Sequence, residues 1–196
     1  MKFKFIKAAL AGSVLTVSGF ANSALVLLVD LTVANQITIS ATAGTSFATV
    51  NGSDTVGFYL TDFFDSTDVY LSDTLVTGNL TSANETSDNS PFLYSEDIGL
   101  NIWNFTNDPQ MTFTAGSVAF IGQATWNIDA SSYANALAGA LAGNVFAPAD
   151  ELSALQNAAA LIGTWEVTTA EKVSAPATLA ILALGIIGVA SRRFKK

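Results

Sequence analysis

The sequence predicts a mainly β protein, an antiparallel, jelly-roll-like β-sandwich with one or two short helices before its last strand. Three observations support this prediction. Short runs rich in Thr, Val, Ile and aromatic residues alternate between apolar and polar positions, which is typical of half-buried strands. Polar turn residues separate these runs. One Ala- and Gly-rich region near the end of the body has helical spacing instead.

Six segments carry the strand pattern. In the first of them, Ile37, Ile39 and Ala41 fall on one face. The six are residues 36–42, 55–61, 98–102, 112–121, 122–128 and 164–168. The turns expected between them include residues 43–45, 51–54 and the long polar stretch 81–91. Many short strands joined by polar turns favour two packed sheets.

The helical region comprises residues 132–142, which are rich in Ala and Gly, and residues 148–162. In the second segment, four apolar residues lie near one face of a helix: Leu152, Leu155, Ala159 and Ile162. Gly163 follows as a plausible C-terminal stop. We therefore expect one or two short helices on an edge of the sandwich, before the final strand.

The charge of this chain is distributed very unevenly. Between Lys7 and Lys172 there is no Lys, Arg or His, whereas all sixteen acidic residues lie in or beside that stretch. From Ala24 to Val173, these sixteen acids oppose Lys172 alone, which gives a formal charge of −15. Such a body should repel nucleic acids and anionic lipid surfaces. Because it cannot form internal salt bridges, its fold must rest on apolar burial and backbone hydrogen bonds.

Two residue types are missing altogether. The chain has no Cys, which excludes thiol chemistry and Cys-ligated metals, and no His, which excludes Ser-His-Asp triads and the commonest transition-metal ligand. Paired carboxylates could still hydrolyse glycosides, but no local motif marks such a pair. We therefore expect no enzymatic activity and no cofactor.

Residues 1–23 have the three parts of a signal peptide. A basic start is followed by an apolar helix-competent run over residues 8–20 and then by small residues. Cleavage is expected between Ser23 and Ala24, or one residue later. The alternative is an uncleaved membrane anchor, because residues 25–29 are apolar as well.

Residues 173–196 form a hydrophobic tail with a basic tip. Residues 177–190 are apolar and would span about 21 Å as a helix, somewhat less than the ~30 Å hydrocarbon core of a membrane. The final RRFKK belongs on the cytoplasmic side by the positive-inside rule. The sequence thus predicts a C-terminal transmembrane helix after an acidic body of residues 24–172.

This tail resembles the PEP-CTERM sorting signals, which exosortases process in Gram-negative bacteria. Val173 and Pro176 match the start of the family pattern, and Arg192 and Arg193 match its Arg-rich end. Ser174 and Ala175 replace the Pro and Glu of that pattern. The resemblance implies transit through the inner membrane, tail removal by exosortase near Pro176, and release to the cell surface or biofilm matrix. The alternative is a plain C-terminal membrane anchor.

Two groups of residues in the body are candidate sites. Asp62, Asp65 and Asp68 form the densest acidic cluster and could attract Ca²⁺, although their spacing fits no calcium loop and a solvated loop face is the simpler interpretation. Four aromatic residues could line a sugar-binding face, although residues of this type in strands usually belong to the core: Trp103, Phe105, Trp126 and Trp165.

These observations together predict an exported protein of the cell surface or biofilm matrix with a structural or interaction role. The resemblance of the tail implies that this role is associated with exopolysaccharide. Its expected partners are the exosortase and the inner membrane during export, and no nucleic acid. The alternative is a carbohydrate-binding or adhesive module delivered by the same route.

Overall fold

The computed structural model describes residues 24–53, 56–67, 69–84, 91–103, 110–156 and 159–168. Within these ranges lie thirteen strands, one α-helix and one short 3-10 helix. The elements are β1 (Leu25–Asp30), β2 (Gln36–Ala41), β3 (Val50–Ser53), β4 (Phe58–Leu60), β5 (Asp73–Gly78), β6 (Thr81–Ser82), β7 (Phe92–Glu96), β8 (Gly99–Trp103), β9 (Gln110–Phe113), β10 (Phe120–Ile121), β11 (Gln123–Ile128), α1 (Ala130–Ala138), β12 (Ala142–Ala147), η1 (Leu152–Gln156) and β13 (Ala160–Val167).

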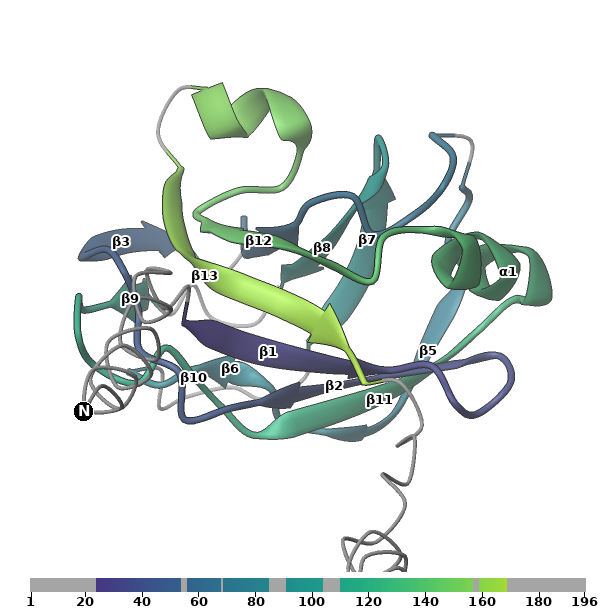
Figure 1. Cartoon of the computed structure of the whole chain (residues 1–196), viewed down its shortest axis with the longest axis horizontal. Coiled ribbons are helices and arrows are strands. Elements are labelled where there is room, and N and C mark those ends of the chain that lie inside the picture. Colours follow the sequence, from purple (N-terminus) through teal and green to yellow (C-terminus); the bar gives the residue numbers. More distant parts are fainter. Residues whose placement is uncertain are drawn as a thin grey trace, which may run out of the picture.

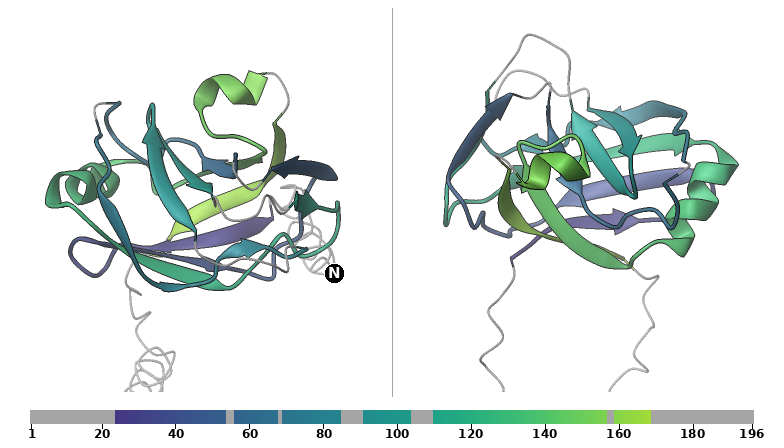
Figure 2. Two further views of the ribbon diagram at one scale, coloured as in Figure 1. Left: turned by 180° about the vertical axis from the view of Figure 1, so that it is seen from behind. Right: turned by 90° about the horizontal axis from the view of Figure 1, so that it is seen from above.

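Nine of these strands form one curled sheet in the order β5-β11-β2-β1-β13-β12-β4-β8-β7. Among the described strands, β1 and β13 are the one parallel pair, and every other pairing is antiparallel. The two outer strands, β5 and β7, come into contact, so that the sheet nearly closes on itself (Figures 1 and 2). Two small pairs, β3-β9 and β6-β10, supplement it.

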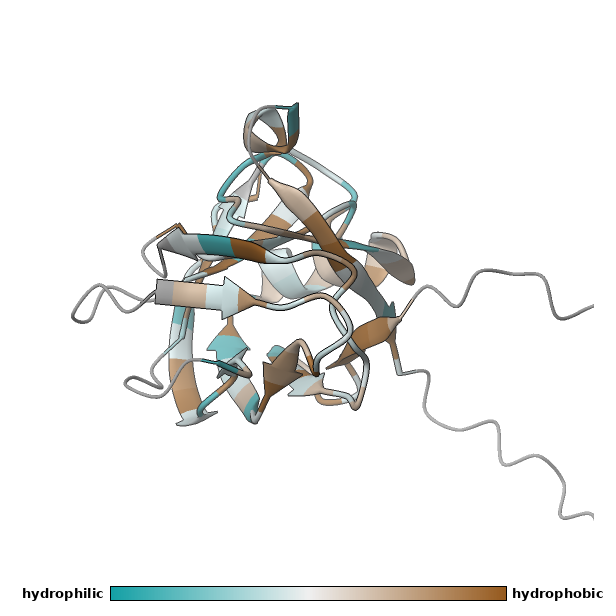
Figure 3. Ribbon diagram, turned by 90° about the vertical axis from the view of Figure 1, so that its left-hand side faces the viewer, coloured by the Kyte–Doolittle hydropathy of each residue, from teal (hydrophilic) through white to brown (hydrophobic). Residues whose placement is uncertain are grey.

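The apolar run at residues 25–29 is strand β1, which lies between β2 and β13 in the middle of the sheet. Val26, Leu27 and Val29 are fully buried there. A strand in this position is covered by neighbours and core on most sides, which explains why its sequence is almost continuously apolar. Hydrophobic and hydrophilic residues follow one another along several strands (Figure 3), and successive side chains of a strand point to opposite faces of the sheet.

The interior of the curled sheet is rich in aromatic rings. Phe120 lies between Phe58 and Phe113, with ring centroids 4.7 Å and 5.1 Å away. Phe63 packs against Trp165 at 5.3 Å. All five rings are at most 3% exposed. Because burial of one such side chain contributes roughly 1.5–3 kcal/mol, this cluster is a main source of stability in a body without internal salt bridges.

The structure confirms a mainly β fold with short helices ahead of the last strand. It differs from the expected sandwich of antiparallel sheets in having one continuous nine-stranded sheet with a parallel pair at its centre. The alternation within a strand indicates which face is buried but not which strand lies beside it. The expected strands at residues 36–42 and 122–128 are β2 and β11.

Several local predictions were wrong. Residues 148–162 do not form one helix, because only η1 is helical among the described residues of this stretch and β13 begins at Ala160. Gly163 is a strand residue rather than a helix stop, and a Cβ at this position would lie 2.6 Å from the Ala24 carbonyl oxygen. Residues 112–121 are not one strand, since a turn with Gly116 at φ +80° separates β9 from β10.

The predicted signal peptide and sorting tail lie outside the described residues. Among the residues that are described, no helix is both long enough and apolar enough to cross a membrane.

Candidate functional site

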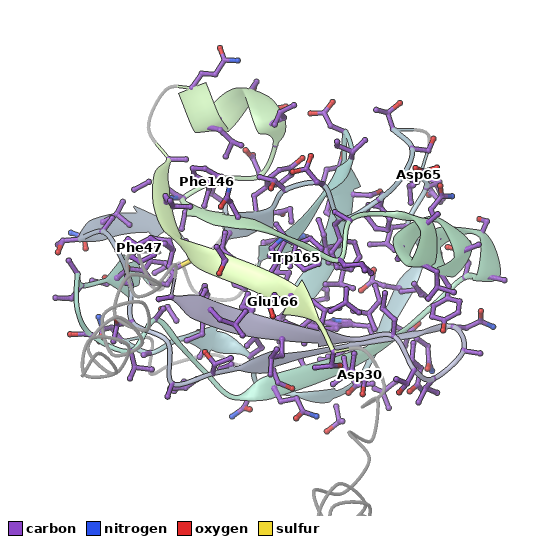
Figure 4. The ribbon with its side chains drawn as sticks, viewed as in Figure 1. Asp30, Phe47, Asp65, Phe146, Trp165 and Glu166 are labelled. Atoms are coloured by element: carbon purple, nitrogen blue, oxygen red, sulfur yellow. The ribbon has the colours of Figure 1, made fainter. Side chains whose placement is uncertain are left out.

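Two of the three tryptophans belong to the core. Trp126 and Trp165 are fully buried, and their indole N–H groups donate to the carbonyl oxygens of Pro91 (3.0 Å) and Thr61 (3.2 Å). Figure 4 labels Trp165 and its exposed neighbour Glu166 on β13. The core interpretation of these two residues is therefore confirmed, and neither is available to a ligand. Phe105 lies outside the described residues.

The third tryptophan lies on the outer side of the sheet. Trp103 ends β8 directly opposite Phe92 on β7, and Tyr94 is the next residue of β7 on the same side. Between them, Leu93 and Ile102 point the other way and are at most 5% exposed. We call the outer surface formed by Phe92, Tyr94 and Trp103 the aromatic face.

The rings of the aromatic face are partly open to solvent. The Phe92 side chain is 40% exposed and that of Tyr94 is 51% exposed, whereas Trp103 is intermediate. The rings of Phe92 and Trp103 have centroids 5.3 Å apart and planes tilted by 33°. β7 is the last strand in the order of the sheet, and beyond it lies β5, with which it is in contact.

The strands under the aromatic face are fixed by buried polar contacts. The Asn101 side chain, opposite Tyr94, donates from Nδ2 to the carbonyl oxygens of Val56 (2.8 Å) and Ala149 (2.9 Å) and lies 3.2 Å from that of Phe58. The buried Tyr59 ring lies across Gly99, where a Cβ would approach the ring to 1.9 Å. Gly99 is therefore required for Tyr59 to pack against β8.

Sequence reasoning missed Phe92 and Tyr94, because their strand follows a polar stretch that was predicted to be a turn. The alternation of Phe92, Leu93 and Tyr94 was the signal that could have identified β7, with Leu93 as its inward residue.

The predicted calcium cluster is only partly described. Asp62 and Asp65 are exposed in the loop after β4, and Asp68 lies outside the described residues. The loop is joined to the α1 region through its backbone, since the Asp62 carbonyl accepts from Ala140 N and Asp65 N donates to the Asn135 carbonyl. In the described part of the chain, no three acidic residues gather closely enough to hold a metal ion.

Asp129 caps the N-terminus of α1. Its Oδ1 accepts from the backbone N–H of Ser131 (3.0 Å) and Ser132 (2.9 Å), and its Oδ2 accepts from Ser72 N (3.4 Å) in the segment before β5. The hydroxyls of Ser131 and Ser132 each lie 2.6 Å from one of its oxygens. Burial alone would raise the pKa of Asp129, but these hydrogen bonds together hold it well below the ordinary value of 3.8.

Asp73 lies where the sheet nearly closes. Its Oδ2 is 3.5 Å from Leu93 N, and the Ser95 hydroxyl donates to the Val69 carbonyl oxygen at 2.7 Å. We call these two contacts between β7 and the segment leading into β5 the seam. Burial raises the pKa of Asp73, and hydrogen bonds from the backbone N–H groups of Leu93 and of Asp73 itself offset part of that effect.

Comparisons with known protein families, with curated proteins and with solved structures found no match. The geometry of these surfaces and the sequence of the tail are therefore the basis for a functional proposal.

Proposed function

We propose that this chain is an exported protein of the cell surface or biofilm matrix, handed to an exosortase-type system during export. Its role is structural or interactive rather than enzymatic, and it is associated with exopolysaccharide. The observation that carries the proposal is the C-terminal segment, with its Val-x-x-Pro motif, its apolar run and its Arg192-Arg193 pair. The mature protein would end close to Pro176.

The position of Ala24 supports cleavage of the signal peptide after Ser23. The Ala24 carbonyl oxygen accepts from Thr164 N at 3.0 Å, so Ala24 takes part in the pairing of β1 with β13. Cleavage after Ser23 keeps this contact, whereas cleavage one residue later would remove it. Removal of the signal peptide at the predicted bond therefore leaves the pairing of Ala24 with Thr164 intact.

The charge distribution supports export to a place where the acidic body meets neither nucleic acid nor a membrane surface. All basic residues lie at Lys7 or before and at Lys172 or after, which confines them to the predicted targeting segments and their border. The acidic body would remain soluble and apart from anionic lipid after release.

The distribution of Lys and Arg also provides the test. Trypsin has no cleavage site between Lys7 and Lys172, so a digest of the extracellular protein should yield one fragment from Ala24 to Lys172. The intact mass of the undigested protein should show that the segment after about Pro176 has been lost. In a host that lacks exosortase, the protein should keep RRFKK and remain with the inner membrane.

Protein from the culture medium that still carries Lys196 would contradict this proposal. A matched pair of variants links the processing to the motif. Substitution of both Arg192 and Arg193 by Gln should block tail removal, whereas substitution of Lys195 and Lys196 by Gln should leave it largely intact.

A carbohydrate-binding or adhesive module, delivered by the same route, is the second candidate function. The specific observation in its favour is the aromatic face, since three aromatic side chains gather there on the outer side of the sheet.

A further inference from the structure

We propose that the aromatic face on β7 and β8 binds a neutral polysaccharide, with the rings of Phe92, Tyr94 and Trp103 stacked against sugar rings. This inference rests on the proposed association with exopolysaccharide, and it names the surface and the class of ligand.

The first argument is the exposure of these rings, because most of the other aromatic residues in the described part of the chain are buried. Eight aromatic side chains of the described body are at most 3% exposed: Phe58, Tyr59, Phe63, Phe64, Phe113, Phe120, Trp126 and Trp165. The aromatic face instead presents two rings that are 40% and 51% exposed beside the intermediate Trp103. Grouped aromatic exposure on a rigid support is typical of a binding surface.

The second argument is shape. The Phe92 and Trp103 rings pack against each other across two strands, with centroids 5.3 Å apart and planes tilted by 33°, and together form one aromatic platform. Tyr94 extends it along β7, because alternate residues of a strand are about 6.6 Å apart. A pyranose ring has a flat face of C–H groups, which packs well on an aromatic ring, and a rim of hydroxyl groups, which remains in water. Several sugar units of one chain could therefore lie along the platform.

The third argument is charge, which decides between classes of ligand that stack on aromatic rings. Nucleic acid bases stack in the same way, but their phosphates need cationic partners. The body has no Lys, Arg or His between Lys7 and Lys172 and a formal charge of −15 from Ala24 to Val173. The same charge disfavours uronic acid polymers and a second copy of this chain. A neutral polysaccharide has no such repulsion.

The fourth argument is rigidity. Asn101 is held by backbone carbonyls from two segments, Val56 and Phe58 in one and Ala149 in the other, and the buried Tyr59 ring packs over Gly99 of β8. A preformed platform loses little conformational entropy when a ligand binds, which favours affinity.

The test uses the exported protein, purified from the culture medium or from detergent-solubilised membranes. Affinity electrophoresis compares gels that contain amylose, xylan, mannan or galactan with gels that contain alginate, an anionic polymer. At least one neutral polysaccharide should retard the protein, and alginate should not. Substitution of Phe92 and Tyr94 by Ala should weaken the retardation on the order of tenfold.

The matched control is Phe47→Ala, which removes another ring that is 43% exposed but lies elsewhere on the surface (Figure 4). It should leave the retardation unchanged, and melting curves verify that every variant is folded. The proposal is overturned if no neutral polysaccharide retards the protein, if only alginate does, or if the double variant behaves like Phe47→Ala. It is also overturned if sedimentation shows that the face instead joins two copies of the chain.

Trp103 provides a second readout. Because Trp126 and Trp165 are fully buried, binding of the polysaccharide that retards the protein should protect Trp103 selectively from oxidation by N-bromosuccinimide. Trp103 that is oxidised equally with and without ligand would place the binding elsewhere. Failure of this inference is separable from failure of the sorting proposal, because the mass of the exported protein reports tail removal whether or not sugar binds.

Discussion

The half-buried carboxylate of Asp73 destabilises the native state. Its pKa is raised by burial, so the charged form is less stable in the folded protein than in the unfolded chain. A raised pKa means that the native state gains stability as the pH falls through the folded pKa towards 3.8, and loses it as the pH rises. Between Lys7 and Lys172 there is no Lys, Arg or His to offset the charge.

We therefore predict that Asp73→Asn raises the free energy of unfolding at pH 7. The effect should stay below about 1 kcal/mol, because solvent screens a carboxylate that is only half-buried. Urea denaturation at several pH values measures it, and the advantage of the variant should vanish below about pH 4. A less stable variant at pH 7 would mean that the contact with Leu93 N outweighs the desolvation.

Asp129→Asn should instead lower the free energy of unfolding at pH 7. The pKa of Asp129 is lowered, so its charge stabilises the native state above the ordinary value of 3.8, and this contribution is lost as the pH falls below that value. At pH 7 we expect a loss of about 0.3–1 kcal/mol, since Asn can still cap α1 but no longer complements the helix dipole. The same urea series serves as the measurement, and a penalty that does not shrink as the pH falls from 5 to 2 would contradict the assignment.

At the scale of elements, the weakest part of the sheet is the seam between β5 and β7. Side-chain contacts join β7 to Asp73 at the start of β5 and to Val69 just before it, and the described residues of β5 and β7 share no ladder of backbone hydrogen bonds. Strands at the edge of a sheet open more readily than strands with neighbours on both sides. We therefore expect amide exchange to be faster in β7 than in β1 and β13.

Ser95→Ala tests this directly. Loss of the 2.7 Å hydrogen bond to the Val69 carbonyl should cost about 1 kcal/mol and speed amide exchange in β7 roughly fivefold. Ser40→Ala, on the outer side of β2, is the matched control and should leave β7 unchanged. Equal exchange in both variants would show that the seam does not hold β7 in place.

Sequence patterns predicted the strands that alternate cleanly and missed those that do not. Ile37 and Ile39 of β2 are fully buried, as their spacing indicated. β1 was obscured because its central place makes it apolar throughout, and β12 because Gly143 and Asn144 weaken its pattern. The segment at residues 148–162 has helical spacing, but Ile162 enters the core from a strand. Tertiary contacts overrode local preference there.

The candidate sites also differ in whether a local sequence pattern could predict them. The interpretation of Trp126 and Trp165 as core residues needed only the rule that large rings in strands are usually buried. The aromatic face depends on the register of β7 with β8, which places Phe92 opposite Trp103. No local pattern contains that register, because it depends on which strands pair.

At the scale of the whole molecule, the distribution of charge predicts that stability rises with ionic strength. The formal charge of −15 between Ala24 and Val173 repels itself in the compact state. Salt at 0.1 M reduces the Debye length to about 10 Å and should relieve this repulsion. The melting temperature should therefore rise between 10 mM and 500 mM NaCl. A flat or falling melting temperature would argue against long-range repulsion as a significant term.

The parallel pairing of β1 with β13 has a mechanical consequence. Both strands run in the same direction at the centre of the sheet (Figure 1), so Ala24 and Thr168 lie at opposite ends of the pair. A force that pulls these two residues apart slides one strand along the other. Contacts such as Thr164 N to the Ala24 carbonyl and Thr168 N to the Val29 carbonyl must then break together.

Attachment through Ala24 and Thr42 would load the antiparallel pair β1-β2 from adjoining ends, and its hydrogen bonds would open one after another. Single-molecule pulling through Cys residues introduced at each pair of positions should therefore need a higher force for Ala24 with Thr168 than for Ala24 with Thr42. Tension along the chain would thus be borne in shear by the strand pair at the centre of the sheet, without a disulfide to share the load.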